Sequence, residues 1–135
     1  MRMLKNAFIL SLTLFVFLGN VAFASNVKEK TTEKTRETVE SAGPDDWYTL
    51  AVCAEKCFGK KVNMKEATKW LNQSLAIKKA PFNLELQGDY YMINQLPEKA
   101  LVSYIEAMNI LKKENNSADF SKLQKKVSEI TNIGG

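Results

Sequence analysis

The chain has 135 residues and a formal net charge of +4, and it contains no histidine. So mild a charge argues against a nucleic-acid-binding protein, whose domain usually carries a concentrated basic face. The absence of histidine removes the usual general base near neutral pH and the commonest metal ligand, which weighs against an enzyme. The length suits one small domain with a tail.

Residues 1–24 have the pattern of an export signal. Arg2 and Lys5 precede an apolar run from Ala7 to Leu18, and Ala22-Phe-Ala24 supplies the small residues of a signal-peptidase site. The run is shorter than the roughly 20 apolar residues of a membrane-spanning helix, which disfavours an uncleaved anchor. We expect cleavage after Ala24, which lowers the net charge to +2 and places the mature chain in the periplasm or outside the cell.

The segment 25–44 is polar and charged. It is rich in Thr, Lys, Glu and Ser, and its only large apolar residues are Val27 and Val39. A segment of this composition buries too little apolar surface to offset the entropy lost on ordering. We predict a flexible charged linker here, in which residues 32–40 can form a transient helix.

From Pro44 onward, apolar residues recur at helical spacing, and no strand-like alternation competes with them. Asn63 with Glu66 three residues later is typical of a capping pair at a helix start. Gly59 predicts a helix end, and Pro81 and Pro97 predict two further starts. We therefore expect five helices near residues 45–58, 63–78, 81–94, 97–113 and 118–131.

Two of these predicted helices share one pattern, thirty-three positions apart. Small, large and small residues recur on one face at steps of four and then three, with Ala67, Leu71 and Ser74 matching Ala100, Tyr104 and Ala107. Such self-similarity is typical of stacked helical hairpins, which usually serve as docking surfaces for other proteins.

The helices near 81–94 and 97–113 resemble a tetratricopeptide repeat. The pattern of that family is matched here by Leu84, Gly88, Tyr91, Ala100, Tyr104 and Ala107. In this resemblance the small residues let two antiparallel helices approach closely, and the tyrosines fill the space beside them. Two positions depart from the family: Gln87 stands where leucine is favoured, and Lys112 stands where a proline usually closes the repeat.

The helices near 45–58 and 63–78 look more like a Sel-one-like repeat, a relative with a longer turn inside its hairpin. The residues that fit its spacing are Leu50, Ala51, Gly59, Asn63, Ala67 and Trp70, and Trp47 and Leu71 complete the predicted packing positions. The departures are Ala51 in place of glycine, Ala54 where an aromatic is usual, and Cys57 where another glycine is usual. An alternative alignment without the longer turn places Glu55 opposite Gly88. We disfavour it because a glutamate at the point of close contact would separate the helices.

The resemblance implies an all-α domain over residues 45–133, built of two stacked antiparallel helical hairpins and a C-terminal capping helix. The cap would seal the second hairpin with Phe120, Leu123, Val127 and Ile130, while its lysines, Lys122, Lys125 and Lys126, face water. Repeats of this family commonly dock partners in a groove lined by the inner helix of each hairpin. By position, that groove would comprise Tyr48, Val52, Glu55, Lys56, Phe82, Glu85, Asp89, Met92 and Ile93.

The predicted groove combines acids with Tyr, Phe and Met, which suits a short peptide or helix with basic and apolar residues. We therefore expect an exported, non-enzymatic interaction module that binds an envelope or secreted protein. The alternative is a structural subunit that packs through its repeat ends in a larger assembly. A further alternative makes Phe82 and Ile93 part of the core, with Glu85 and Asp89 on a solvated face.

No Gly-rich phosphate loop, Ser/His constellation or metal-ligand cluster is present in the sequence. We accordingly expect no catalytic residue, no cofactor, no metal, no nucleic acid and no small-molecule substrate. Cys53 and Cys57 would lie about 5–6 Å apart at Cβ on a helix, whereas a relaxed disulfide needs roughly 3.5–4.5 Å. They are interpreted as small apolar core residues, with a strained or regulatory pair and a metal or redox site as the alternatives.

Overall fold

The computed structural model describes residues 23–133, which form helices and turns and contain no strand. A helix over residues 23–41, here called the N-terminal helix, precedes the five labelled ones. These are α2 (Trp47–Lys60), α3 (Met64–Ile77), α4 (Pro81–Ile93), α5 (Pro97–Glu114) and α6 (Ser121–Ile133). The predicted all-α class is confirmed. The predicted export signal, apart from its last two residues, lies outside the described residues.

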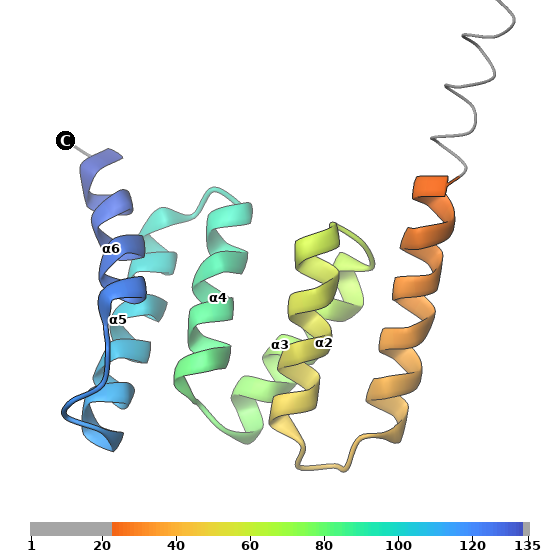
Figure 1. Ribbon diagram of the computed structural model, residues 1–135, viewed down its shortest axis with the longest axis horizontal. Coiled ribbons are helices and arrows are strands. Elements are labelled where there is room, and N and C mark those ends of the chain that lie inside the picture. Colours follow the sequence, from red (N-terminus) through yellow and green to blue (C-terminus); the bar gives the residue numbers. More distant parts are fainter. Residues whose placement is uncertain (1–22, 134–135) are drawn as a thin grey trace, which may run out of the picture.

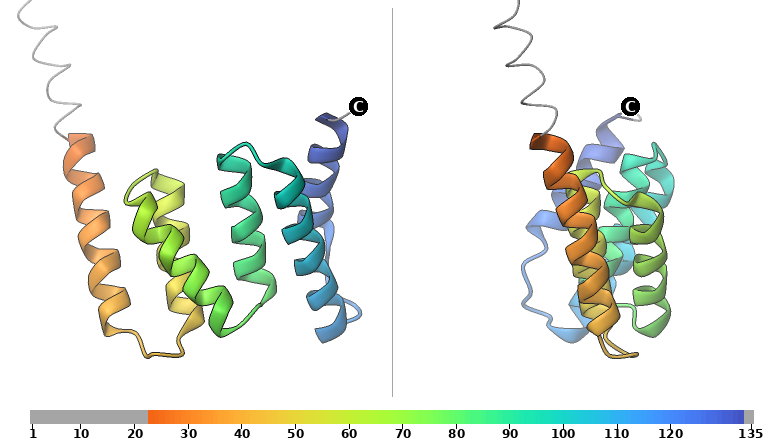
Figure 2. Two further views of the ribbon diagram at one scale, coloured as in Figure 1. Left: turned by 180° about the vertical axis from the view of Figure 1, so that it is seen from behind. Right: turned by 90° about the vertical axis from the view of Figure 1, so that its right-hand side faces the viewer.

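Successive helices run in opposite directions (Figure 1). Helix α2 packs chiefly on α3 and α4 chiefly on α5, while α2 also contacts α4 and α6 contacts α5. In the view of Figure 1, α3 and α5 lie behind α2 and α4, and the N-terminal helix and α6 flank the row at its two ends (Figures 1 and 2). Helix α4 also contacts α3, so the two helix pairs meet where α4 lies against both α2 and α3.

The turns between these helices follow local sequence signals, but two of them differ from our predictions. Pro81 and Pro97 each occupy the first turn of a helix, as predicted. Gly59, predicted to end the first helix, lies inside α2, and Lys61 ends that helix in a left-handed conformation with φ of 53°. Asn63 makes no capping bond to the backbone, because its side chain donates to the Glu66 carboxylate instead.

Two clusters of buried residues form the core. The first lies between α2 and α3 and is joined by Leu86 of α4, and the second joins α4, α5 and α6. Ala51, Ala67, Ala100 and Ala107 are fully buried. Small residues therefore lie at the close contacts within both helix pairs, as the repeated pattern predicts.

The outermost predicted packing positions are less enclosed than the alanines. Trp47 and Tyr91 are only half-buried, and a lysine ammonium lies beside each ring, Lys78 at 5.4 Å and Lys99 at 5.8 Å from the ring centroid. Both aromatic side chains thus combine packing on one face with a cation on the other.

Helix α6 covers the second core cluster. Leu123 and Ile130 are buried, and Val127 packs against the same cluster. The helix begins three residues later than predicted, because the Asp119 carboxylate accepts the Ser121 backbone N–H at 2.8 Å. Phe120 therefore precedes α6 and is half-buried.

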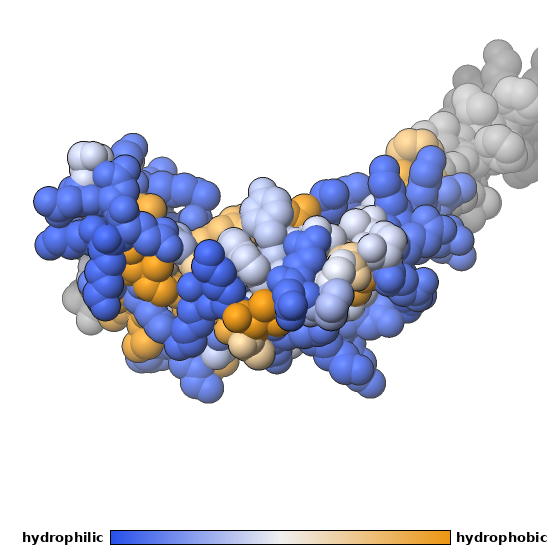
Figure 3. All heavy atoms as spheres, turned by 90° about the horizontal axis from the view of Figure 1, so that it is seen from below, coloured by the Kyte–Doolittle hydropathy of each residue, from blue (hydrophilic) through white to orange (hydrophobic). Residues whose placement is uncertain are grey.

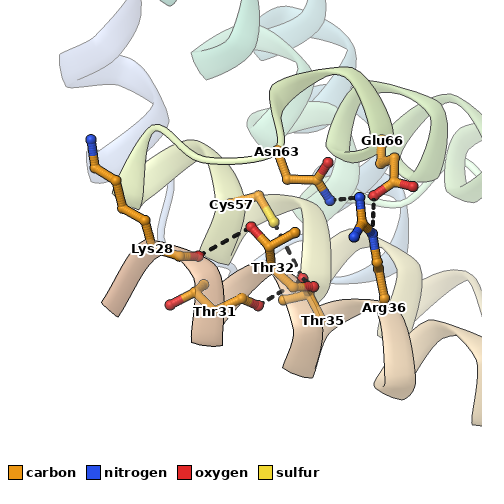
Figure 4. Close-up of polar contacts among 8 residues, drawn as sticks. All are labelled: Lys28, Thr31, Thr32, Thr35, Arg36, Cys57, Asn63 and Glu66. Carbon is orange, nitrogen blue, oxygen red and sulfur yellow. Dashed lines mark hydrogen bonds and ion pairs between the residues drawn. The ribbon is translucent and has the colours of Figure 1, made fainter. Parts of the chain in front are cut away.

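The N-terminal helix occupies most of the segment for which we predicted a flexible linker. Thr35 is only 3% exposed, and its hydroxyl lies 3.5 Å from the Cys57 sulfur of α2 (Figure 4). Arg36 forms an ion pair of 2.7 Å with Glu66 of α3, and Val39 packs against the first core cluster. The helix docks through one threonine, one valine and one ion pair, which is too few apolar contacts for its composition to have revealed it.

Candidate functional site

The face where α2 meets α4 holds most of the predicted groove, and a buried polar network fixes its geometry. The Asn83 amide of α4 donates to the Ser74 hydroxyl of α3 at 2.9 Å and to the Lys78 carbonyl at 2.7 Å. Ser74 in turn donates to the Trp47 carbonyl of α2 at 2.7 Å. Since Asn83 and Ser74 are fully buried, these bonds form away from competing water and join three helices.

Sequence reasoning overlooked this network. Ser74 counted only as a small packing residue, and Asn83 was not singled out. A signal was nevertheless present, because Asn83 lies three residues after Ala80, the position from which a side chain reaches back to a helix start. Its amide oxygen accepts the Ala80 backbone N–H at 2.9 Å.

Two aromatic rings border the α2–α4 face. The centroids of Tyr48 on α2 and Phe82 on α4 are 5.4 Å apart with tilted planes, and Trp47 meets Tyr48 edge-on at 5.6 Å. Phe82 packs against the first core cluster, while Tyr48 is 55% exposed. An aromatic surface is thus anchored on the core side and open on the solvent side.

Two of the three acids of the predicted groove, Glu85 and Asp89, already have partners within the chain. Glu85 is paired with Lys122 and with Lys126 at 2.7 Å each. Asp89 accepts a hydrogen bond from the Tyr104 hydroxyl at 2.7 Å and forms an ion pair with Lys126. Lys126, which we expected to face water, is instead half-buried and reaches toward α4, where the docking of α6 places it. Lys122 and Lys125 are exposed, as expected, although Lys122 also pairs with Glu85.

These contacts affect the titration of both partners. Burial acts to raise the pKa of Glu85, but its hydrogen bonds to Lys122 and Lys126 prevail and hold that pKa below its usual value. Burial acts to lower the pKa of Lys126, yet hydrogen bonds to Asp89 and Glu85 raise it. Glu85 and Lys126 are thus both charged near neutral pH and compensate each other, so Glu85 offers a partner little free negative charge.

The predicted groove residues do not form one continuous groove. Glu55, Phe82, Glu85 and Asp89 border a pocket of about 40 Å³, well below the roughly 300–1,000 Å³ of small-molecule sites. Lys56 lines a separate pocket against the N-terminal helix. Of the remaining four, Tyr48 borders Phe82 as described above. The other three are dispersed: Val52 is half-buried, Met92 packs against the second core cluster, and Ile93 is 47% exposed.

A second apolar surface, on α5, was not foreseen. Val102 is 65% and Ile105 41% exposed, and Val102 borders a pocket of about 340 Å³ with Tyr91 and Lys99. On the side of the molecule seen in Figure 3, hydrophobic residues form separate patches among hydrophilic ones. Exposed apolar side chains that adjoin a pocket can mark an interaction site.

Cys53 and Cys57 are both buried and unbonded to each other. Burial raises the pKa of the Cys53 thiol, which opposes formation of a reactive thiolate. Among residues 23–133, no three His, Cys, Asp or Glu side chains are placed to hold a metal ion. Within the same residues, no helix has the length and apolar character needed to cross a membrane.

A scan of protein-family models, a search of curated proteins and a search of solved structures each returned no match to this chain. The resemblance to tetratricopeptide and Sel-one-like repeats therefore rests on the residue pattern alone.

Proposed function

We propose that this chain is an exported, non-enzymatic interaction module with a repeat fold of the tetratricopeptide type. Its α2–α4 face would receive a peptide or helix of an envelope or secreted protein. The proposal is supported by the two antiparallel helix pairs, which meet where α4 contacts α2 and α3, and by the fully buried alanines at the repeat positions. Stacked helical pairs of this kind expose long faces suited to docking.

The observation that carries the proposal is the Tyr48–Phe82 pair. An aromatic side chain that is 55% exposed yet packed against another ring offers a rigid apolar contact, and aromatic residues are enriched at binding hot spots. Because Glu85 and Asp89 are neutralised by α6, an apolar anchor on the partner would supply most of the affinity. Among the described residues Glu55 forms no ion pair, so it is the acid left to favour a basic neighbour of that anchor.

The test is site-specific photo-crosslinking in the native host. A photoreactive phenylalanine replaces Tyr48, and the control carries it at Asn109, an exposed residue of α5. We expect a discrete protein adduct from position 48 but not from position 109, with a lower yield when Phe82→Ala is added. Equal labelling from both positions, or no adduct at position 48, would refute docking on the α2–α4 face.

The exposed pair on α5 favours a second candidate, a structural subunit of a larger assembly. Val102 and Ile105 would then be covered by a neighbouring subunit. Sedimentation at increasing protein concentration should reveal association, and Val102→Lys with Ile105→Lys should abolish it. The control places the same two charges at Asn72 and Gln73, exposed polar residues of α3 that lie outside this surface. A monomer at every concentration would eliminate self-association through this surface.

A further inference from the structure

A pocket separate from the α2–α4 face lies between the N-terminal helix and α2. Its volume is about 300 Å³, at the lower end of the range for small-molecule sites. The lining consists of Val27, Lys30, Thr31, Lys34, Thr35, Thr38, Lys56 and Lys60. Four lysines and no acid therefore surround one cavity; the term lysine pocket is used for it below.

Two contacts set the register of the helices that form the lysine pocket. Lys60 donates to the Thr31 hydroxyl at 3.1 Å, and the Thr35 hydroxyl lies 3.5 Å from the Cys57 sulfur. Figure 4 shows Thr35 of the N-terminal helix next to Cys57 of α2. The turn that carries Lys30 therefore lies beside Lys60, and the turn that carries Lys34 lies beside Lys56. The lysines form two levels, each with one cation from either helix.

The lysines of the lysine pocket have no direct carboxylate partner within the described part of the chain. None of its four lysines forms an ion pair among residues 23–133, where Arg36 is paired with Glu66 instead. The glutamates of the N-terminal helix, including Glu33 and Glu37, are exposed and do not line the pocket. A cleft lined by charges of one sign focuses its field and raises the local concentration of counter-ions.

The chemistry of the lining suits a multiply charged anion. All its cations are lysines, whose ammonium groups bind phosphate oxygens as point charges, and four of them around one cavity favour an anion with more than one negative charge. Val27 is the only apolar side chain that lines the pocket, so a peptide would lack anchors. The Thr31, Thr35 and Thr38 hydroxyls already donate to carbonyls of their own helix. The lysine ammonium groups are therefore the available donors.

We propose that the lysine pocket binds a phosphate-class ligand with at least two negative charges, held between Lys30 and Lys34 on one helix and Lys56 and Lys60 on the other. The ligand would bridge the N-terminal helix to α2 and so stabilise their packing. This site is independent of the proposed partner-binding face, and each can be disproved without the other.

Pyrophosphate is the first probe, titrated into the full chain at low ionic strength, where exposed charges are least screened. It should raise the melting temperature of the wild type in a saturable manner. Lys30→Gln with Lys34→Gln, and separately Lys56→Gln with Lys60→Gln, should each weaken the apparent affinity about tenfold or more, as loss of charge-assisted hydrogen bonds would.

The matched control is Lys65→Gln with Lys69→Gln on α3, which removes two exposed lysines at the same spacing. This control should bind pyrophosphate like the wild type. Equal weakening in the control and the pocket variants would overturn the proposal, as would no saturable shift in the wild type. Among the residues that the structure describes, the side chains of Lys30 and Lys34 take part in no hydrogen bond to another side chain, so the variant of these two residues should retain the wild-type circular dichroism. A loss of pyrophosphate affinity in that variant is then caused by the lost charge and not by unfolding.

Two further arms identify the source of the phosphate. Binding to vesicles that contain phosphatidylglycerol but not to phosphatidylcholine vesicles, lost in the pocket variants alone, would assign the ligand to a lipid headgroup. Binding of pyrophosphate in solution without such vesicle binding would assign it to a soluble phosphate. A tetraglutamate peptide that binds more tightly than pyrophosphate would overturn the phosphate-class assignment.

Discussion

Gly88 of α4 faces the ring of Tyr104 of α5 so closely that a Cβ atom at position 88 would lie 2.2 Å from Tyr104 Cε1. Tyr104 is 2% exposed, and its hydroxyl is bonded to Asp89. The ring can therefore not turn aside without losing a hydrogen bond and disturbing the second core cluster. A glycine is required here by the approach of two helices rather than by backbone conformation.

Gly88→Ala should accordingly destabilise the domain. Overpacking of a closed core usually costs about 1–3 kcal/mol, which exceeds the gain of roughly 0.5–1 kcal/mol from replacing a helical glycine by alanine. The control is Gly59→Ala in α2, where an added Cβ meets nothing within 4 Å. The only expected effect there is the higher helix propensity of alanine, which stabilises the folded state. Urea unfolding should show a lower midpoint for position 88 and an equal or higher one for position 59. A higher midpoint for Gly88→Ala would refute the contact.

Asn83→Ala should weaken the junction of the two helix pairs. The substitution leaves the Lys78 carbonyl and the Ser74 hydroxyl with fewer partners in a buried region, at a cost of about 1–3 kcal/mol. Asn72→Ala, at an exposed site on α3, should have little effect. Thermal unfolding of the two variants checks the difference. Equal melting temperatures would mean that the network contributes nothing to stability.

The helices, their approximate limits and the small residues between them could be predicted from sequence because their signals are local. Proline starts, apolar periodicity and the repeated alanines all act within a few residues. The pairing of Glu85 with Lys122 and Lys126 could not be predicted, because it depends on how α6 docks across the chain. The N-terminal helix was missed for a different reason, since its buried contact is a threonine whose hydroxyl is bonded to its own backbone.

Lys126 holds α6 against α4, and its removal should loosen that helix. The ammonium is paired with Glu85 and Asp89 and lies 5.4 Å from the Tyr104 ring centroid. Lys126→Ala should speed hydrogen exchange in α6 and lower the unfolding free energy by about 1 kcal/mol, more than a fully exposed ion pair would. Lys125→Ala, one residue away and exposed, should change neither quantity. If hydrogen exchange in α6 were equally fast in Lys126→Ala and Lys125→Ala, the pairing of Lys126 with Glu85 and Asp89 would not hold α6 in place.

The same cluster predicts a loss of stability in acid. Because the folded state holds the pKa of Glu85 below its usual value, the carboxylate contributes stability above its unfolded pKa of about 4.3. That contribution disappears as the pH falls through the folded pKa. Unfolding free energies measured from pH 6 down to pH 2 should therefore fall more steeply for the wild type than for Glu85→Gln. Parallel curves for the two proteins would show that Glu85 is not coupled to folding.

Thr35→Lys should detach the N-terminal helix, because it forces a charge into a site that is 3% exposed and close to the lysine pocket. The fully buried Cys57 thiol reports this opening when Cys53 is replaced by alanine. We expect alkylation of Cys57 to accelerate about tenfold or more, since that requires only about 1.4 kcal/mol of weakened packing. Asn26→Lys adds the same charge at an exposed site on the same helix and should leave the rate unchanged. If Thr35→Lys also leaves it unchanged, the helix does not shield Cys57 in solution, and the register assigned to the lysine pocket fails with it.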